Sequence, residues 1–233
     1  LTETSPVIAV NTPEAFRIGT VGRAIDGVEI AIAADGEILT RGPHVMKGYY
    51  RKPEATAEVI DAEGWFHTGD IGELDSDGFL RITDRKKDII VTAGGKNIAP
   101  QPIENLAKTS KFVANAVMIG DKRRFPSMLV VPNFEKLTAW AEHRNLAFAD
   151  QVSLIALPEA REKMDREVRK TLRELAHFEM PKKILLLPRD FTIESGELTP
   201  KLSVRRRAVE KNYQRQIEAL YAEGDEETMQ QAG

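Results

Sequence analysis

The sequence predicts an α+β protein made of two units, a β-rich unit followed by a compact α+β domain. In the first part, short apolar runs alternate with turn residues roughly every ten positions, which is typical of a small antiparallel sheet. In the second part, apolar stripes at helical spacing lie between short apolar strands. Between the two parts, five consecutive charged residues at 84–88 cannot enter a core and indicate an exposed joint.

The β-rich part begins with loop and short strand at 1–20. Strands are expected at 28–33 and 38–40, and a short helix at 53–60, where three apolar residues have helical spacing. Asp75, Ser76, Asp77 and Gly78 separate two apolar runs within 65–83, which predicts a β-hairpin. The antiparallel sheet therefore extends up to the charged run.

The second part is expected to start with a glycine-containing loop at 92–97. Pro102 and Asn133 are each suited to the beginning of a helix, the first at N1 and the second as N-cap. The remaining expected elements are strands at 113–119, 128–131 and 184–187 and helices at 158–176 and 205–221. Residues 222–233 are acidic and polar and are expected to be disordered.

Composition excludes several classes of protein. The chain has 233 residues with 33 Lys and Arg against 36 Asp and Glu, so its formal charge of −3 provides no general attraction to nucleic acid. The absence of cysteine excludes disulfides, a thiolate nucleophile and a thiolate metal site. The longest apolar runs are much shorter than a membrane span. A cytoplasmic location is expected, with peripheral contact at a membrane left open.

Four motifs occur in order along the chain. They are TE at 2–3, GEILTRGPHVMKGYY at 36–50, the central stretch with TGD, DRKKD and a glycine loop at 64–100, and FTIESGELTPKLSVRR at 191–206. Together they closely resemble the adenylate-forming enzymes, and within them the long-chain fatty acyl-CoA synthetases. The resemblance implies that the chain is the carboxy-terminal part of a longer enzyme and that an upstream N-terminal domain is its partner.

The same resemblance implies domains and an activity. Residues 1–86 would end the large AMP-binding domain, 87–221 would form a mobile lid domain, and 222–233 would be a tail. The implied reaction joins a fatty acid to AMP and then to coenzyme A, with ATP, Mg²⁺ and CoA as the required ligands. A fragment of this kind is expected to be inactive by itself, because the phosphate loop and the acyl tunnel of the family lie upstream.

Asp70 is the first candidate for ligand binding. A carboxylate on a glycine turn can accept hydrogen bonds from both hydroxyls of a ribose, and the resemblance assigns Asp70 to the nucleotide sugar. Arg85 would be the second contact to that sugar. Thr2 and Glu3 would approach the ATP phosphates and the magnesium ion. The alternatives are that Asp70 only caps its own turn and that residues 2–3 fray at the terminus, which is the favoured interpretation of residues 2–3 in this fragment.

Lys87 falls at the hinge position of the family. A hinge residue must absorb a large change of backbone angles while it remains solvated, and a charged residue suits this role. The alternative is that Lys86 and Lys87 are simply a solvated face. Gly94 and Gly95 would allow the backbone to approach a ligand, and in the family this loop lies beside the pantetheine channel. A phosphate loop is rejected, because the GxxxxGK[ST] spacing is missing.

Lys201 is the candidate catalytic residue. In the family a lysine on a loop near the carboxy terminus neutralises the charge that develops during adenylation. The long-chain pattern usually has this lysine two residues later, where Ser203 stands here, and the alternative is that Lys201 only caps a turn. The run of three arginines at 205–207 would either contact CoA phosphates or, as the favoured reading, form a solvated helix face.

Two other functions remain open at this point. One is adenylation followed by transfer to the thiol of a carrier protein, although no carrier domain follows in the sequence. The other is a non-catalytic interaction module.

Overall fold

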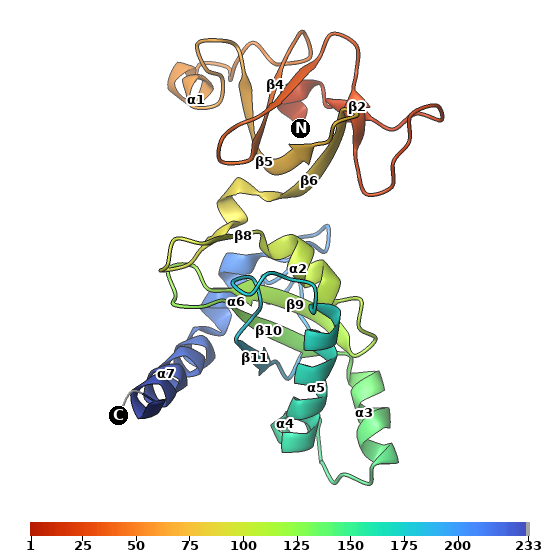
Figure 1. Cartoon of the computed structure of the whole chain (residues 1–233), viewed down its shortest axis with the longest axis vertical. Coiled ribbons are helices and arrows are strands. Elements are labelled where there is room, and N and C mark those ends of the chain that lie inside the picture. Colours follow the sequence, from red (N-terminus) through yellow and green to blue (C-terminus); the bar gives the residue numbers. More distant parts are fainter. Residues whose placement is uncertain (232–233) are drawn as a thin grey trace. The chain divides into compact units, whose positions relative to one another are not determined.

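The computed structural model describes the backbone of residues 1–231 and the side chains of residues 1–222 (Figure 1). The chain divides into two compact units, Leu1–Ile89 and Ile90–Gly233. This division falls close to the 86/87 boundary that the sequence predicts. Helices and sheets together confirm the α+β class. No helix among the described residues combines the length and the apolar character needed to span a membrane.

The first unit is built on a six-stranded antiparallel sheet with the order β1-β2-β6-β5-β4-β3. Its strands are β1 (Ala9–Val10), β2 (Gly22–Ala24), β3 (Glu29–Ile32), β4 (Glu37–Arg41), β5 (Phe66–Leu74) and β6 (Phe79–Arg85). The helical elements are the 3₁₀ turns η1 (Thr2–Thr4) and η2 (Lys86–Asp88) and the helix α1 (Pro53–Ala57). Helix α1 is shorter than predicted, because Ile60 instead forms a β-bridge with Phe66.

The predicted hairpin between β5 and β6 is confirmed. Asp75 closes its turn, since Oδ1 accepts hydrogen bonds from the backbone N–H groups of Asp77 (3.0 Å) and Phe79 (2.9 Å). Gly78 has a φ of +82°, which a glycine adopts without strain. The resulting register places Leu74 opposite Leu80 and Asp70 opposite Arg85.

The prediction that all of 84–88 is exposed is wrong for Asp84. Strand β6 continues through Arg85, so neighbouring residues lie on opposite faces and Asp84 falls on the covered one. Its side chain is buried, and its Oδ1 accepts a hydrogen bond of 2.7 Å from the backbone N–H of Arg85. The alternation of side chains along β6 therefore buries Asp84, although it belongs to the charged run at 84–88.

The second unit is built on a three-stranded sheet with the order β11-β10-β9 and a separate two-stranded ribbon β7-β8. Its strands are β7 (Ile90–Val91), β8 (Asn97–Ile98), β9 (Val113–Ile119), β10 (Ser127–Pro132) and β11 (Lys183–Leu186). Its helices are α2 (Pro100–Ala107), α3 (Phe134–His143), α4 (Gln151–Ala156), α5 (Pro158–Thr171), α6 (Arg206–Asn212) and α7 (Gln214–Gln231). Strand β9 is antiparallel to β10, whereas β11 is parallel to it.

Both faces of this sheet are covered. Met118, Met128 and Val130 lie in one core with the inner faces of α2, α3, α4 and α5. The alternate residues, among them Val117 and Leu129, lie in a second core with α6, the first turns of α7 and Phe191. Since side chains alternate along a strand, two opposite layers of helix explain why the central strands are apolar throughout.

Several element ends differ from the predicted ones. Helix α2 begins at Pro100, two residues before the predicted Pro102. Asn133 caps α3 as predicted, with its side chain accepting a hydrogen bond from the backbone N–H of Lys136. The predicted helix at 205–221 is interrupted at Tyr213. Helix α7 is assigned through Gln231, over most of the predicted disordered tail, and residues 232–233 lie outside the described residues.

Candidate functional site

Asp70 and Arg85, the two residues predicted to bind the nucleotide sugar, lie side by side in the first unit. They face each other across β5 and β6, with 2.6 Å between Arg85 Nε and Asp70 Oδ1. The side chain of Asp70 is 13% exposed and that of Arg85 is 47% exposed. Burial raises the pKa of Asp70, although the charges of Arg85, the Leu1 amino group and Lys87 oppose the shift. The pair thus presents an acceptor and a donor at the end of β6, between the two central strands of the sheet.

A bulge within β5, where the pairing with β4 shifts register, turns the backbone at Gly69 and holds Asp70 in place. Gly69 has a φ of +70°. Thr68 fixes this turn, because its hydroxyl donates to the carbonyl of Ile38 (2.7 Å) and accepts from the backbone N–H of Asp70 (3.1 Å). The turn is therefore capped by Thr68, and the carboxylate of Asp70 pairs with Arg85 instead of only capping its own turn. The role of Asp70 in binding a ligand stays a prediction.

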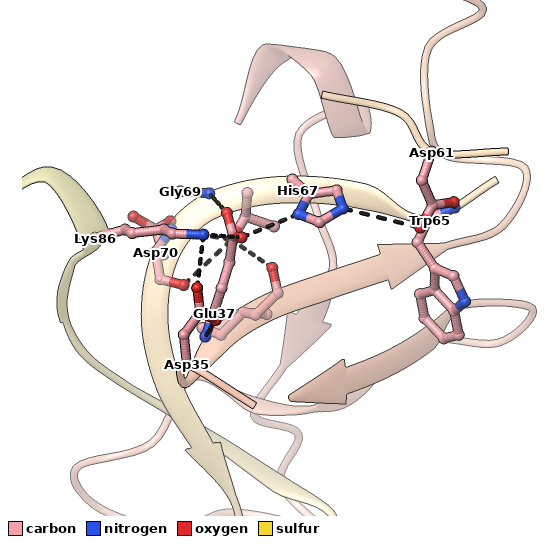
Figure 2. Close-up of polar contacts among 10 residues, drawn as sticks. Asp35, Glu37, Asp61, Trp65, His67, Gly69, Asp70 and Lys86 are labelled. Carbon is pink, nitrogen blue, oxygen red and sulfur yellow. Dashed lines mark hydrogen bonds and ion pairs between the residues drawn. The ribbon is translucent and has the colours of Figure 1, made fainter. Parts of the chain in front are cut away.

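Glu37 is a buried carboxylate at this site that the sequence analysis did not single out (Figure 2). Its Oε1 accepts a hydrogen bond of 2.9 Å from the backbone N–H of Gly69. Its Oε2 lies 2.8 Å from Lys86 Nζ and 3.0 Å from His67 Nδ1. No local signal marks it, because a glutamate at the start of the strand EILTR is typical of a solvated strand end and its partner Lys86 is 49 residues away.

The charges around Glu37 determine its protonation. Burial alone would raise the pKa of Glu37, but hydrogen bonds from Lys86, His67 and Gly69 lower it. Asp35 also pairs with Lys86 at 2.7 Å, and this ion pair together with the one to Glu37 raises the pKa of Lys86. Glu37 therefore stays ionised and Lys86 stays cationic at neutral pH.

Thr2 and Glu3 form the 3₁₀ turn η1 and are not frayed as one alternative predicted. The backbone carbonyl of Glu3 accepts a hydrogen bond from Met46 N–H (2.8 Å), and its carboxylate accepts one from the hydroxyl of Tyr49 (3.0 Å). Within the described residues, no group of three or more acidic, histidine or cysteine side chains could hold a metal ion alone. One carboxylate fits a magnesium ion whose other ligands are phosphate oxygens and water.

Lys86 and Lys87 are both exposed, as the solvated-face alternative predicts, but the contacts of Lys86 are distinctive. Its ammonium group pairs with two carboxylates of the first unit, those of Asp35 and Glu37. Both lie in η2, which ends one residue before the last residue of the first unit. The position of Lys87 is consistent with a hinge, and that role stays a prediction.

The loop with Gly94 and Gly95 joins β7 to β8 in the second unit. Gly95 has a φ of +71°, and a Cβ placed there would meet no heavy atom within 4 Å. The base of the loop is fixed, because Ala93 N–H donates to the carbonyl of Arg123 and Lys122 N–H donates to the carbonyl of Val91, both at 2.8 Å. The glycines thus lie on an open tip above a rigid base.

Lys201 lies in a tight turn of the second unit. Leu198 and Val204 form a β-bridge, and Thr199 N–H donates to the carbonyl of Ser203 at 2.8 Å. Leu202 completes the turn with a φ of +60°. The side chain of Lys201 is exposed, and no hydrogen bond or ion pair among the described residues involves its amino group. Nothing described in the second unit supports the alternative in which Lys201 caps a turn.

Glu197 lies directly before the turn that carries Lys201 and fixes its base. Its side chain is fully buried and accepts two hydrogen bonds from Arg189 (2.7 and 2.9 Å). Further hydrogen bonds come from Ser195 Oγ (2.7 Å) and Asn212 Nδ2 (3.0 Å). Burial would raise the pKa of Glu197, but the hydrogen bonds from Arg189, Asn212 and Ser195 lower it. The exposed Lys201 is therefore carried on a fixed base.

Replacing Glu197 by alanine is expected to lower the free energy of unfolding of the chain by about 2 kcal/mol. The value is moderate because Arg189 is half-exposed, so water can solvate it after the carboxylate is lost. Because the pKa of Glu197 is lowered in the folded state, this contribution is present above the ordinary glutamate pKa and is lost as the pH falls through the folded value. Urea unfolding at neutral and acidic pH measures both effects.

Glu174→Ala is the matched control for Glu197→Ala. Glu174 forms an ion pair with Arg173 in which both side chains are highly exposed, so its loss is expected to change stability by less than about 0.5 kcal/mol. Equal effects of the two substitutions would contradict the anchoring role of Glu197.

The expectation that 205–207 form a solvated face is wrong for Arg206. Its guanidinium Nη1 lies 2.6 Å from Oε1 of the buried Glu104 and also donates to the carbonyl of Met118. Glu104 in turn accepts a hydrogen bond of 2.7 Å from Met118 N–H. Arg206 therefore joins α6 to α2 and β9, and it is not available for CoA phosphates. Arg205 and Arg207 are exposed.

Residues 87–225 of the chain match the family described as AMP-binding enzyme C-terminal domain, which is more than half of the chain. The chain belongs to this family. Comparison with individual proteins confirms the resemblance to long-chain fatty acyl-CoA synthetases that the sequence motifs indicated. Long-chain-fatty-acid–CoA ligase FadD15 of Mycobacterium bovis is 40% identical over 222 residues, which make up 95% of this chain and 37% of that protein.

Two further relatives of this AMP-binding enzyme domain extend the comparison. Long-chain-fatty-acid–CoA ligase ACSBG1 of Bos taurus is 35% identical, over 96% of this chain and 34% of its own length. The solved structure of o-succinylbenzoate coenzyme A synthetase from Bacillus subtilis in complex with AMP is 26% identical with a TM-score of 0.61, over 89% of this chain and 39% of that one. The chain thus spans little more than a third of the length of these relatives.

Proposed function

We propose that this chain forms the hinge and lid part of an ATP-dependent fatty-acid–CoA ligase. In the first step, the fatty-acid carboxylate attacks the α-phosphorus of ATP, and acyl-AMP forms as pyrophosphate leaves. In the second step, the CoA thiol attacks the acyl carbon, and the thioester forms as AMP leaves. The observation that carries this proposal is the Asp70–Arg85 pair, which places a carboxylate and a guanidinium together in a chain 40% identical to a long-chain ligase.

Each residue has a defined role in this proposal. Asp70 accepts hydrogen bonds from the ribose hydroxyls, and Arg85 holds the nucleotide through its permanent charge. Thr2 approaches the ATP phosphates, and Glu3 supplies one carboxylate to Mg²⁺ while the phosphates and water supply the rest. Lys201 neutralises the charge that develops on the transferring group during adenylation.

The two steps use different parts of the second unit. Rotation at Lys87 would first present Lys201 and then the loop with Gly94 and Gly95, beside which the pantetheine arm of CoA would pass. Exposure of Lys201 and the open tip at Gly95 support this assignment, since each is free to meet a ligand. A cytoplasmic enzyme with peripheral contact at a membrane is consistent with this chemistry.

A chimera tests the proposal. We expect that an enzyme in which this chain replaces the matching segment of the mycobacterial relative catalyses ATP–pyrophosphate exchange with a long-chain fatty acid and forms acyl-CoA. The chain alone is expected to do neither. Offering the acyl-AMP either CoA or the phosphopantetheine thiol of a carrier protein distinguishes the two acceptors. A folded chimera that fails to catalyse ATP–pyrophosphate exchange with every fatty acid tested would contradict the proposal. The interaction-module alternative would then remain.

A further inference from the structure

Glu37 connects three segments of the first unit through one buried carboxylate (Figure 2). Its Oε1 receives the Gly69 N–H, directly before Asp70, and its Oε2 receives the ammonium group of Lys86, directly before Lys87. The Glu37 side chain is 5% exposed, whereas that of Lys86 is 48% exposed. The turn that carries the sugar ligand and the residue that precedes the predicted hinge thus share a single anionic partner.

A shared buried charge makes its contacts dependent on one another. A carboxylate removed from water must be compensated by hydrogen bonds and counter-charges, so the loss of one partner changes the energy of those that remain. If Lys86 is lost, Oε2 keeps its contact with His67 Nδ1 (3.0 Å) but loses the lysine counter-charge, and the orientation of the carboxylate toward Gly69 N–H changes. Asp35 holds the other side of Lys86 at 2.7 Å, which keeps the ammonium group over Glu37.

We infer that Glu37 is a positioning residue that couples the sugar-binding turn at Gly69–Asp70 to the linker residue Lys86. It orients Asp70 through Gly69 and fixes the upstream side of the linker through Lys86, so that a change of backbone angles is confined to Lys87 and the residues after it. The inference rests on the proposed function only in the role that it gives Asp70. The physical coupling itself exists independently of catalysis and is measurable in the chain as it is.

Amide hydrogen exchange of the chain, followed by NMR at single residues, tests the coupling. Glu37→Gln is expected to accelerate exchange of the Gly69 amide by about tenfold, the factor expected for the loss of a hydrogen bond to a charged group. Lys86→Met is expected to accelerate the same amide severalfold, although Lys86 does not touch Gly69. Lys86→Arg keeps the cation and is expected to restore the slow exchange. Lys52→Met removes an exposed lysine of the same unit and is expected to leave the amide unchanged.

The result that would overturn the inference is a Gly69 amide in Lys86→Met that exchanges as slowly as in the wild type while Glu37→Gln accelerates it. Such a result would show that Glu37 serves the turn alone. In the chimera, Lys86→Met is expected to raise the KM for ATP severalfold with a smaller effect on kcat, and Lys86→Arg to reverse it. Altered exchange together with an inactive chimera would refute the proposed function and leave the coupling intact.

Discussion

Lys201→Ala is expected to lower the rate of ATP–pyrophosphate exchange in the chimera by about 10²–10³-fold, the range observed when a group that stabilises developing charge is removed. Thioester formation from pre-made acyl-AMP is expected to continue, because the second step relies on the loop at Gly94 and Gly95. The physical reason is that Lys201 is exposed on a rigid turn whose base is held by Glu197, so its ammonium group is presented without a competing partner among the described residues. The measurement is the rate of ATP–pyrophosphate exchange and, separately, the rate of thioester formation from acyl-AMP, in wild type and Lys201→Ala.

Two variants make the test of Lys201 specific. Lys108→Ala removes an exposed lysine elsewhere in the second unit and is expected to leave both half-reactions unchanged. Adding Ser203→Lys to Lys201→Ala moves the ammonium group to the place where long-chain synthetases usually carry it. Partial recovery of exchange would show that the turn accepts the lysine at either position. Undiminished exchange in Lys201→Ala would mean that another cation performs this step.

Asp70→Asn is expected to reduce kcat/KM for ATP in the chimera by about 100-fold, because the amide replaces two charge-assisted hydrogen bonds to the ribose by weaker ones. The same substitution is expected to leave the stability of the chain unchanged or to increase it slightly. Burial raises the pKa of Asp70, so the ionised carboxylate is less stable in the folded chain than in the unfolded chain. Asp70→Asn is therefore expected to impair the use of ATP without destabilising the folded chain.

The raised pKa of Asp70 determines how its contribution to the free energy of unfolding changes with pH. Since its pKa is higher in the folded state, the folded chain binds more protons between the ordinary aspartate pKa and the folded value. This group therefore favours the folded state most below the ordinary pKa, and the advantage is lost as the pH rises through the folded pKa. Urea unfolding of wild type and Asp70→Asn across this interval is expected to show the difference between the two curves grow with pH.

Arg81→Gln is the matched control for Asp70→Asn. Arg81 lies on the same strand pair and forms an exposed ion pair with Glu73, so its loss is expected to change neither ATP kinetics nor the pH dependence. If Asp70→Asn lowered the free energy of unfolding by as much as it raised the activation free energy derived from kcat/KM, Asp70 would be a structural residue. Its role as the sugar ligand would then be refuted.

Local patterns in the sequence were sufficient to predict most elements. The turn residues at 75–78 predicted the β5–β6 hairpin, and the β9 strand has the predicted bounds. Asn133 was recognised as an N-cap because its side chain acts on a backbone N–H only three residues away. Asp150 caps α4 in a comparable way through a capping box with Ser153, and that signal was present but was not used.

Long-range pairings were not predictable in the same way. Glu37 and Glu104 read as ordinary surface glutamates in the sequence, because the partners that pay for their burial, Lys86 and Arg206, are 49 and 102 residues away. The parallel orientation of β11 to β10 is likewise absent from any local pattern, since an apolar run of that length fits either direction. Each of these features depends on the way in which distant segments meet.

The sequence by itself determined the α+β class and the hairpin, and it predicted the roles that are proposed here for Asp70, Arg85 and Lys201. These depend on local turn chemistry and on motifs that can be read in order along the chain. Only the tertiary structure decided that Asp70 faces Arg85 across two strands, that Lys86 pairs with Asp35 and Glu37, and that Arg206 pairs with the buried Glu104. The reason is that a buried charge is determined by its partner, and sequence distance does not reveal which partner the fold brings to it.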